Sequence, residues 1–368
     1  MKRNTLNLAL AGAASFQAYT TGTYTLNDLL AVTERVVNFG EDSLAQVIQA
    51  DLAAHNLVTL GMLAELATPT TLSAEAAGAQ VDGDMVELDE FGLSPTQKTT
   101  LPAGVAYPLG KFGHAVGWTK DYMLRAKVAD IVAATGRATR GHRVALQRAI
   151  TKALFTPTNY SVRDKFRDGA VLNVKRLYNA DGDPISSGPN GEFFDGTVHT
   201  HYQANATLTT TALDTLIGSV LEHGYGNDLR VYINRAQDAT VRALTGFAPV
   251  LDARIIAPTT GTYAQGDLNV AAADNRQIGV YGGAAIWTKP WVPAGYVFCY
   301  AAGDPIKPLK FRQDDAPELQ GLRMVAQESV HPLVVDNFEA YYGFGAFGRG
   351  NGAVLYVGGA SYVVPTIP

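Results

Sequence analysis

The sequence predicts an α+β fold in which helical and strand-like stretches are largely separate along the chain. Three observations support this. Residues 120–155 carry apolar side chains at helical spacing. Residues 160–205 and 324–357 contain short β-branched and aromatic runs that are typical of strands. Between them, residues 207–323 alternate helical and strand-like segments, so a second, mixed α/β domain is expected there.

The N-terminal stretch, "MKRNTLNLALAGAASF", is similar to a short signal peptide because Lys2 and Arg3 precede an apolar run. Asn4 and Asn7 interrupt that run, which is barely of the minimum length. We therefore expect an N-terminal arm in preference to an export signal.

Residues 25–64 follow the arm and predict two helices. Thr25 with Asp28 resembles a capping pair. Ser43 with Gln46 forms a capping box before an apolar run at helical spacing. A Thr/Pro/Ala-rich patch then ends the helical pattern.

The segment from Met85 to Trp118 predicts a long hairpin, because strand-like pieces alternate around the turn residues Ser94, Pro95 and Gly104. It has too few large apolar residues to form a core of its own. Since an isolated two-stranded hairpin is marginally stable in water, something outside the segment must hold it.

A long helix is expected to follow, with Thr119 as a plausible N-cap. Leu146, Ile150 and Leu154 recur every four residues up to Phe155. Gly136 and Gly141 predict an interruption within this stretch. Residues 160–205 then return to strands, with the turn-rich residues 179–194 as a hairpin tip.

Residues 207–323 predict the mixed α/β domain. A helix is expected at 212–221, a strand at 229–233, and a second helix capped by Asn234. Further short strands are expected at 278–281, 284–287 and 296–301.

Strands return from Met324 to Val357. Apolar side chains alternate along one face of this stretch at Phe338, Ala340, Tyr342, Phe344 and Ala346. Because Glu339 and Arg349 are the only charges from residue 338 to the end, the sheet is expected to be covered on both sides.

Gly343, Gly345 and Gly348 match the pattern G-x-G-x-x-G. A nucleotide-binding loop of this kind needs a helix after it and an acidic residue about 20 positions later. A strand-like run follows instead, and no acidic residue occurs after Glu339. We therefore expect glycines that shape a turn or bulge through positive φ angles, and no bound nucleotide.

Few metal-binding patterns occur. His199 and His201 would face the same way in a strand and could share a metal, but no third ligand is spaced nearby, so hydrogen-bonded surface histidines are the favoured interpretation. A calcium loop beginning at Asn179 fails, because Pro184 and Asn190 occupy the positions that need Gly and Glu.

Composition narrows the possible functions. Charged residues make up 17% of the chain and glycines number 37, which suggests a surface that contacts other protein. The net charge of -5 argues against a basic grip on nucleic acid. No apolar run is long enough to span a membrane. Cys299, the only cysteine, lies in an apolar run that predicts a buried, inert thiol. The sequence contains no complete catalytic motif, so neither an enzyme nor a bound cofactor is expected.

The order of these parts resembles the major capsid protein of tailed bacteriophages, the Hong Kong 97-type fold. "VAYPLGKFGHAVGWTKDYM" is similar to the returning arm of that family's extended loop and the start of its spine helix. "LRVYINRAQDATVRAL" is similar to the strand and helix of its axial domain. "VHPLVVDNFEAYYGFGAFGRGNGAVLYVGG" resembles the closing strands of its peripheral domain, where strands pass closely.

The resemblance implies four parts. These are an N-terminal arm with helices (residues 1–75), an extended loop (76–118), a peripheral domain with the spine helix (119–206 and 324–368), and an axial domain (207–323). It implies a structural subunit that self-assembles through pentamers and hexamers into an icosahedral capsid enclosing genomic DNA. The expected partners are portal and scaffolding proteins, with non-specific contact to DNA. The expected location is the virion, after assembly in the host cytoplasm.

Two further expectations follow from the resemblance. The extended loop should lie across an adjacent subunit through its large apolar side chains, which are Phe91, Leu93, Val105, Tyr107, Leu109 and Phe112. Some members of the family cross-link a loop lysine to a neighbour's asparagine, and Lys98 and Lys111 lie in that segment here, but no partner asparagine can be identified. An encapsulin-like shell that stores a cargo enzyme is the alternative function.

Overall fold

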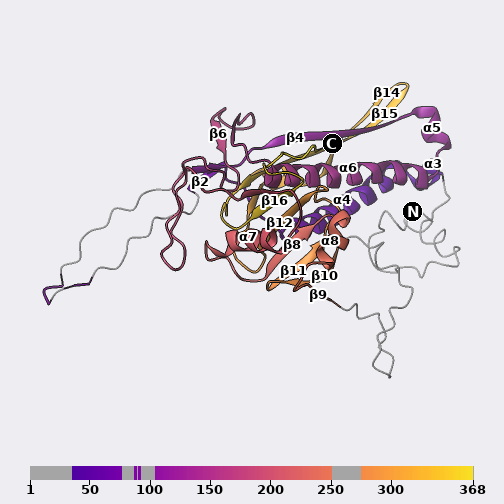
Figure 1. Ribbon diagram of the computed structural model, residues 1–368. Coiled ribbons are helices and arrows are strands. Elements are labelled where there is room, and N and C mark those ends of the chain that lie inside the picture. Colours follow the sequence, from indigo (N-terminus) through magenta and orange to yellow (C-terminus); the bar gives the residue numbers. More distant parts are fainter. Residues whose placement is uncertain (1–34, 77–86, 89, 93–103, 251–274, 368) are drawn as a thin grey trace, which may run out of the picture. The chain divides into compact units, whose positions relative to one another are not determined.

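The computed structural model describes residues 35–76, 87–88, 90–92, 104–250 and 275–367 (Figure 1). These residues divide into two compact units. The first comprises the described residues of Met1–Ala64, Leu109–Leu146 and Gln313–Tyr342, and the second those of Glu65–Pro108, Gln147–Arg312 and Gly343–Pro368. The predicted N-terminal arm with its Thr25–Asp28 pair, and Leu93 and Lys98 of the loop, lie outside the described residues.

Two helices open the described part of the first unit, α3 (Val36–Phe39) and α4 (Glu41–Leu63). The predicted capping box of Ser43 and Gln46 is wrong. The helix α4 begins two residues before Ser43, with Gly40 at the N-cap and no side-chain cap. Gly40 can take this place because its φ of 92° lets the chain turn sharply between the two helices.

The helix α5 (Lys120–Arg125) begins as predicted, because the Thr119 side chain accepts a hydrogen bond from the backbone N–H of Tyr122. The next helix, α6 (Val128–Phe155), is long and ends where the sequence predicts. It is not interrupted at Gly136 or Gly141. An interior glycine destabilises a helix by about 1 kcal/mol relative to alanine. Packing of the apolar face of α6 offsets this cost.

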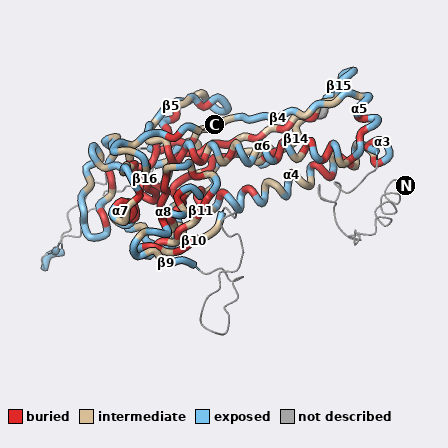
Figure 2. The backbone as a smooth tube through the Cα atoms, turned by 45° about the vertical axis from the view of Figure 1, so that its right-hand side comes forward, coloured by how far each residue is buried: buried red, intermediate tan, exposed pale blue. Residues whose placement is uncertain are grey.

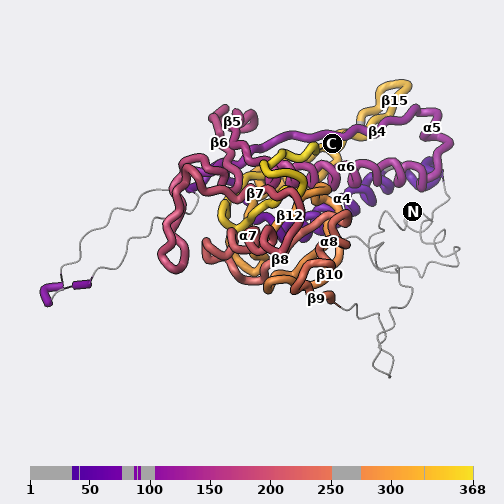
Figure 3. The backbone as a smooth tube through the Cα atoms, viewed as in Figure 1, coloured from indigo at the N-terminus to yellow at the C-terminus, as the bar shows by residue number. Residues whose placement is uncertain are grey.

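Three antiparallel strands complete the first unit. The central one, β15 (Leu333–Ala346), pairs on one side with β14 (Arg323–Val330) and on the other with β4 (Gly110–Thr119). Figure 3 shows β4 running alongside β15. The predicted alternation is confirmed, since Phe338, Ala340 and Tyr342 are buried. The prediction that Met85–Trp118 forms a hairpin is wrong for the residues of β4. This strand pairs with β15, in the C-terminal part of the chain, and not with the preceding part of the segment.

A seven-stranded sheet is the centre of the second unit, in the order β7-β16-β12-β8-β11-β10-β9. The bounds of its strands are β7 (Tyr202–Asn205), β8 (Leu229–Ile233), β9 (Ala248–Pro249), β10 (Arg276–Tyr281), β11 (Ala284–Thr288), β12 (Tyr296–Ala301) and β16 (Ala353–Val357). The helix α7 (Thr210–Leu221) buries its apolar face in the same core as these strands. Figure 2 shows the buried residues concentrated in this sheet.

The predicted elements of residues 207–301 are confirmed. The capping role of Asn234 is confirmed too: its side chain accepts from the N–H of Ala236 at the start of a 3-10 turn (Arg235–Gln237), which leads into α8 (Asp238–Arg242). Val231 of β8 and Cys299 of β12 face each other in register in the apolar core of this region.

The sheet does not follow the predicted division into peripheral and axial domains. The strands β7 and β16 come from the stretches assigned to the peripheral domain, yet they pair with each other in parallel, and β16 pairs with β12. The strand β16 therefore continues the sheet that residues 207–323 begin.

Smaller pairings complete the second unit. The strand β13 (Leu309–Arg312) lies between β1 (Ala67–Thr70) and the last residues of β15. The strands β2 (Ala74–Ala76) and β3 (Gly104–Ala106) pair with each other. So do β5 (Tyr160–Arg163) and β6 (Val171–Val174).

The predicted hairpin with residues 179–194 at its tip is present only as one antiparallel bridge, between Asn179 and Thr200, and the residues between them are irregular. Side chains hold this irregular segment: buried Arg349 pairs with Asp181 at 2.8 Å and with Asp183 at 2.6 Å. Among the described residues, no helix has the length and apolar character needed to cross a membrane.

Candidate metal centre and contact surfaces

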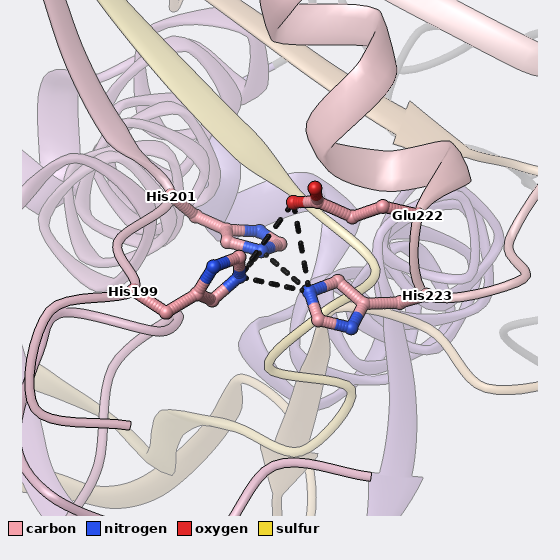
Figure 4. A group of neighbouring side chains, drawn as sticks. All are labelled: His199, His201, Glu222 and His223. Atoms are coloured by element: carbon pink, nitrogen blue, oxygen red, sulfur yellow. Dashed lines mark hydrogen bonds and ion pairs between the residues drawn. The ribbon is translucent and has the colours of Figure 1, made fainter. Parts of the chain in front are cut away.

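Three histidines and one glutamate converge in the second unit (Figure 4). The Nε2 atoms of His199, His201 and His223 form a triangle with sides of 3.1, 3.0 and 3.0 Å. The Oε1 atom of Glu222 lies 3.6 Å from Nε2 of His199 and 3.9 Å from Nε2 of His223. The donor set is therefore three imidazole nitrogens and one carboxylate oxygen.

The chain segment before β7 supplies two of these histidines, and hydrogen bonds position His201. The backbone N–H of His201 donates to the Tyr178 carbonyl, and its carbonyl accepts from the N–H of Val354 in β16, each at 2.8 Å. The side chain of His201 is fully buried, and its Nδ1 lies 2.6 Å from the carbonyl oxygen of Gly352. Because a carbonyl oxygen only accepts, Nδ1 of His201 carries the proton, and Nε2 is left with its lone pair.

The C-terminal end of α7 supplies the other two groups. Glu222 is the C-cap residue and His223 follows it, after which Gly224 turns the chain with a φ of 80°. The exposed carbonyls at a helix C-terminus carry partial negative charge. This end of α7 is therefore favourable for a cation.

Aromatic rings and a glycine backbone enclose the cluster. The Phe194 ring lies 4.5 Å from the ring of His223, and the Tyr178 ring lies 5.3 Å from it, measured between centroids. A Cβ atom added at Gly350 would lie 3.1 Å from Cγ of His223, so a larger residue there would require the ring to shift slightly. The surroundings are thus largely apolar.

All three histidines have lowered pKa values, which keeps them neutral near pH 7. Burial and then the neighbouring His199 lower the pKa of His223 to about 3. Burial lowers the pKa of His199. The pKa of His201 falls well below its usual value, through burial and then through His223. Burial, followed by Glu192, raises the pKa of Glu222.

The sequence identified only half of this cluster. His199 and His201 were recognised as a pair that could share a metal, but the lack of a third ligand close in sequence favoured surface histidines, which is wrong for His201 because its side chain is fully buried. His223 is distant in sequence and approaches only because α7 ends beside the segment that precedes β7. The one local signal was the adjacent Glu222 and His223 at the predicted helix end.

Other residues singled out in the sequence have ordinary structural partners. The acids of the failed calcium pattern, Asp181 and Asp183, both pair with Lys175 and Arg349. Cys299 is buried as predicted, and burial raises the pKa of its thiol to about 12.

The glycine-rich motif lies in the last residues of β15 and in the loop that follows that strand. Gly343 and Gly345 lie inside β15, opposite Arg312 and Lys310 of β13. None of the three motif glycines has a positive φ, so the predicted reason for the glycines is wrong, although a turn between β15 and β16 does begin at Gly348, whose carbonyl accepts from the N–H of Asn351. The expected close passage of strands is confirmed, because a Cβ at Gly345 would lie 2.7 Å from the Ala106 carbonyl oxygen. The strand β16 follows the motif where a nucleotide loop needs a helix.

The structure corrects half of the predicted loop contact set. Val105, Tyr107 and Leu109 are buried within their own chain, so they are not available to a neighbour. Tyr107 is held by its hydroxyl, which donates to Glu75 at 2.7 Å, and by its N–H, which donates to the Ser73 carbonyl. The expectation failed because β2 gives β3 a partner in the same subunit.

Two other members of the set have exposed side chains. Phe91 is 79% exposed and Phe112 is 45% exposed, with the Phe112 ring stacked on Tyr342 at 4.3 Å. Leu93 lies outside the described residues. Of the two lysines considered for cross-linking, Lys111 pairs with Glu339 at 2.6 Å, and Lys98 is not described.

No protein-family model matches this sequence, and neither does any curated protein. Among solved structures, a chain from Mycobacterium phage Patience is similar over 95% of this chain and 97% of its own, with 22% identity and a TM-score of 0.65. The native capsid of a GTA particle is similar over 96% and 100%, with 13% identity and a TM-score of 0.48. The SrpI encapsulin of Synechococcus elongatus PCC 7942 is similar over 86% and 92%, with 13% identity and a TM-score of 0.43.

The assignment of fold rests on the first of these structures, because its TM-score alone among the three exceeds 0.5. The chain has the Hong Kong 97-type fold, as the resemblance predicted.

Proposed function

We propose that this chain is a structural subunit, without enzymatic activity, that self-assembles into the icosahedral capsid of a tailed bacteriophage. The likeness to the Mycobacterium phage Patience chain supports this most, because it extends over 95% of the present chain and 97% of that chain.

The surface of the first unit supports a role in self-association. Large apolar side chains are exposed along one end of α4, on α5 and where β14 joins β15. They are Leu57, Val58, Met62, Tyr122, Leu124, Val330 and Leu333. The exposed side chains of α5 and of the β14–β15 turn lie on neighbouring elements, because the N–H of Lys120 donates to the Pro332 carbonyl, and such groups are typical of surfaces that bind other protein. The proposed occupant is a second copy of this chain.

The extended loop adds to this surface. Phe91 and Phe112 would contact the adjacent subunit in pentamers and hexamers. Burying a large side chain contributes about 1.5–3 kcal/mol before ordering costs, and a shell repeats each contact at every subunit.

Further partners belong to the same proposal. Portal and scaffolding proteins would take part in assembly in the host cytoplasm, and the finished shell would enclose the genome in the virion. The net charge of -5 is compatible with a shell whose inner surface contacts DNA without binding it tightly.

Electron microscopy of the purified full-length protein tests the proposal. Closed shells of uniform diameter are expected, and shells isolated from an infection should contain DNA. Shells that hold a cargo protein and no DNA would favour the encapsulin-like alternative. A protein that stays monomeric at all concentrations and salt conditions, with or without a scaffolding protein, would contradict self-assembly.

A further inference from the structure

We propose that His199, His201, His223 and Glu222 bind one divalent transition-metal ion, best suited to Zn²⁺, in a structural site within the subunit. This goes beyond the capsid role, which requires no metal. Of the described residues, these four are the one group with the ligand atoms to hold such an ion.

The distances suit tetrahedral coordination. Zn–N bonds of about 2.0–2.1 Å place two nitrogens of a tetrahedron about 3.3–3.4 Å apart. The three Nε2 atoms are 3.0–3.1 Å apart, so each ring needs to move by only a few tenths of an ångström. Glu222 Oε1, at 3.6 Å from His199 and 3.9 Å from His223, lies near the fourth vertex.

Hydrogen bonding among the histidines alone does not account for the triangle. Each short contact needs one nitrogen that donates and one that accepts, and each Nε2 has either a proton or a lone pair. Three nitrogens in mutual contact therefore include at least one pair of the same kind. A metal ion removes this conflict, because all three nitrogens direct lone pairs at it.

The surrounding residues orient the ligands as outer-shell partners of a metal site do. The Gly352 carbonyl accepts from Nδ1 of His201 at 2.6 Å, which fixes the tautomer that presents Nε2 to the metal. The neighbouring positive charge of Arg349 is balanced by Asp181 and Asp183. The described surroundings therefore hold no uncompensated cation that would repel the ion.

The ligand set indicates a structural ion. Four protein ligands close a tetrahedral zinc site, whereas a catalytic site keeps one position for water. The ion would join the end of α7 to the segment before β7, two places that otherwise share no backbone hydrogen bond among those described. The carboxylate of Glu222 is 34% exposed, which gives the ion a route from solvent.

The test uses the full-length unassembled chain, treated with EDTA, dialysed, and then titrated with Zn²⁺. We expect one zinc per chain after gel filtration, measured by elemental analysis, and a higher Tm with zinc than without. The matched control is His114→Asn, which changes an exposed histidine in β4. It should bind zinc like the unmodified protein.

His199→Gln is the main variant, because this side chain is partly exposed and its removal leaves the buried His201 in place. We expect zinc affinity to fall by more than about 100-fold, since losing an outer-shell partner alone costs 10–100-fold. Glu222→Gln should weaken binding less, and serves as the second variant if His199→Gln does not fold. Affinity unchanged by Glu222→Gln overturns the assignment of the fourth ligand.

Co²⁺ as a probe reports geometry directly. The intense visible absorption of a tetrahedral site is expected for the EDTA-treated chain, and it should be lost in His199→Gln. Failure of the unmodified chain to retain zinc, a Tm that zinc does not raise, or the weak absorption of octahedral Co²⁺ would each overturn the proposal. Microscopy of shells is independent of all these measurements.

Discussion

Arg312 donates a 2.7 Å hydrogen bond from Nη2 to the carboxylate of Asp164, and both side chains are buried. Nη1 of Arg312 also donates to the Tyr107 carbonyl at 2.8 Å. This pair therefore joins β13, the turn between β5 and β6, and the chain after β3. The guanidinium of Arg312 therefore holds Tyr107, in the predicted extended loop, inside its own subunit, in addition to the apolar contacts of that residue.

The first prediction concerns this pair. Arg312→Met should destabilise the second unit by about 3–5 kcal/mol, because the carboxylate of Asp164 loses its compensating charge in a buried place. Urea unfolding at pH 7 measures the change. The double variant Arg312→Met/Asp164→Leu should recover most of the loss, since no buried charge remains. A double variant as unstable as the single one would show that the shape of Arg312, and not its charge, matters.

The second prediction separates close packing from backbone strain at the glycines. Gly345→Ala should destabilise the second unit by about 1–3 kcal/mol, because the new Cβ meets the Ala106 carbonyl oxygen at 2.7 Å and Cδ1 of Tyr107 at 2.8 Å. Gly218→Ala in α7 is the matched control, because a Cβ there has nothing within 4 Å. It should stabilise by about 0.5–1 kcal/mol. Equal effects from both substitutions would contradict the close-packing explanation.

The third prediction concerns pH. In the first unit, Nε2 of His55 lies 3.0 Å from Nδ1 of His142, and burial followed by His55 lowers the pKa of His142 from 6.5 to about 4. The unfolded chain therefore binds a proton that the folded chain does not bind between these values. The contribution of neutral His142 to the free energy of unfolding is therefore fully present above pH 6.5 and is lost as the pH falls toward 4.

At pH 5 the expected loss from His142 is about 2 kcal/mol relative to pH 7. Thermal and urea unfolding of the unmodified chain and of His142→Gln at both pH values measure it. Other histidines with lowered pKa values titrate in the same range, so the difference between the two proteins is the informative quantity. A pH dependence that is the same in both would rule out His142 as the source.

The fourth prediction is that two residues of the extended loop have different roles: Val105 is needed for folding of the subunit, and Phe91 is needed for assembly of the shell. Phe91→Asp should leave a folded subunit that forms no shells, because Phe91 is 79% exposed and is proposed to contact a neighbour. Val105→Asp should prevent folding, because Val105 is 1% exposed in its own chain. Circular dichroism and sedimentation distinguish these outcomes. Normal shells from Phe91→Asp would remove it from the contact.

The fifth prediction shortens the loop at a point that the structure defines. Ala76 and Gly104 are partners in the β2–β3 ladder, so an Asn-Gly turn can replace residues 77–103 and close a tight hairpin. The shortened chain should fold with native-like circular dichroism and sediment as monomers or isolated capsomers. Closed shells of normal size from this chain would show that the removed residues are not a principal lateral contact.

Much of the fold could be predicted because local patterns determined it. The strand β12 is a continuous apolar run, and β8 is apolar except at Arg230. Asn234 marks the turn after β8 by a capping interaction that acts over three residues. Errors arose where local signals were weaker than packing. Gly136 and Gly141 do not break α6, and the Ser43 capping box lies inside α4.

The candidate site could be predicted only in part, because it depends on contacts between distant parts of the sequence. The pairing of β7 with β16 places Gly352 against His201, and the end of α7 adds His223. No spacing rule relates these positions. The burial of Val105 and Tyr107 was missed for the same reason, since β2 and β13 lie far from them in sequence.

The partner of β4 has a consequence for the order of synthesis. All ten residues of β4, Gly110–Thr119, pair with β15, which the ribosome makes more than 200 residues later. At about 5–20 residues per second, the strand emerges many seconds before its partner exists. An incomplete chain therefore cannot form the three-stranded sheet of the first unit. Prematurely terminated chains would lack this surface and be left out of assembly.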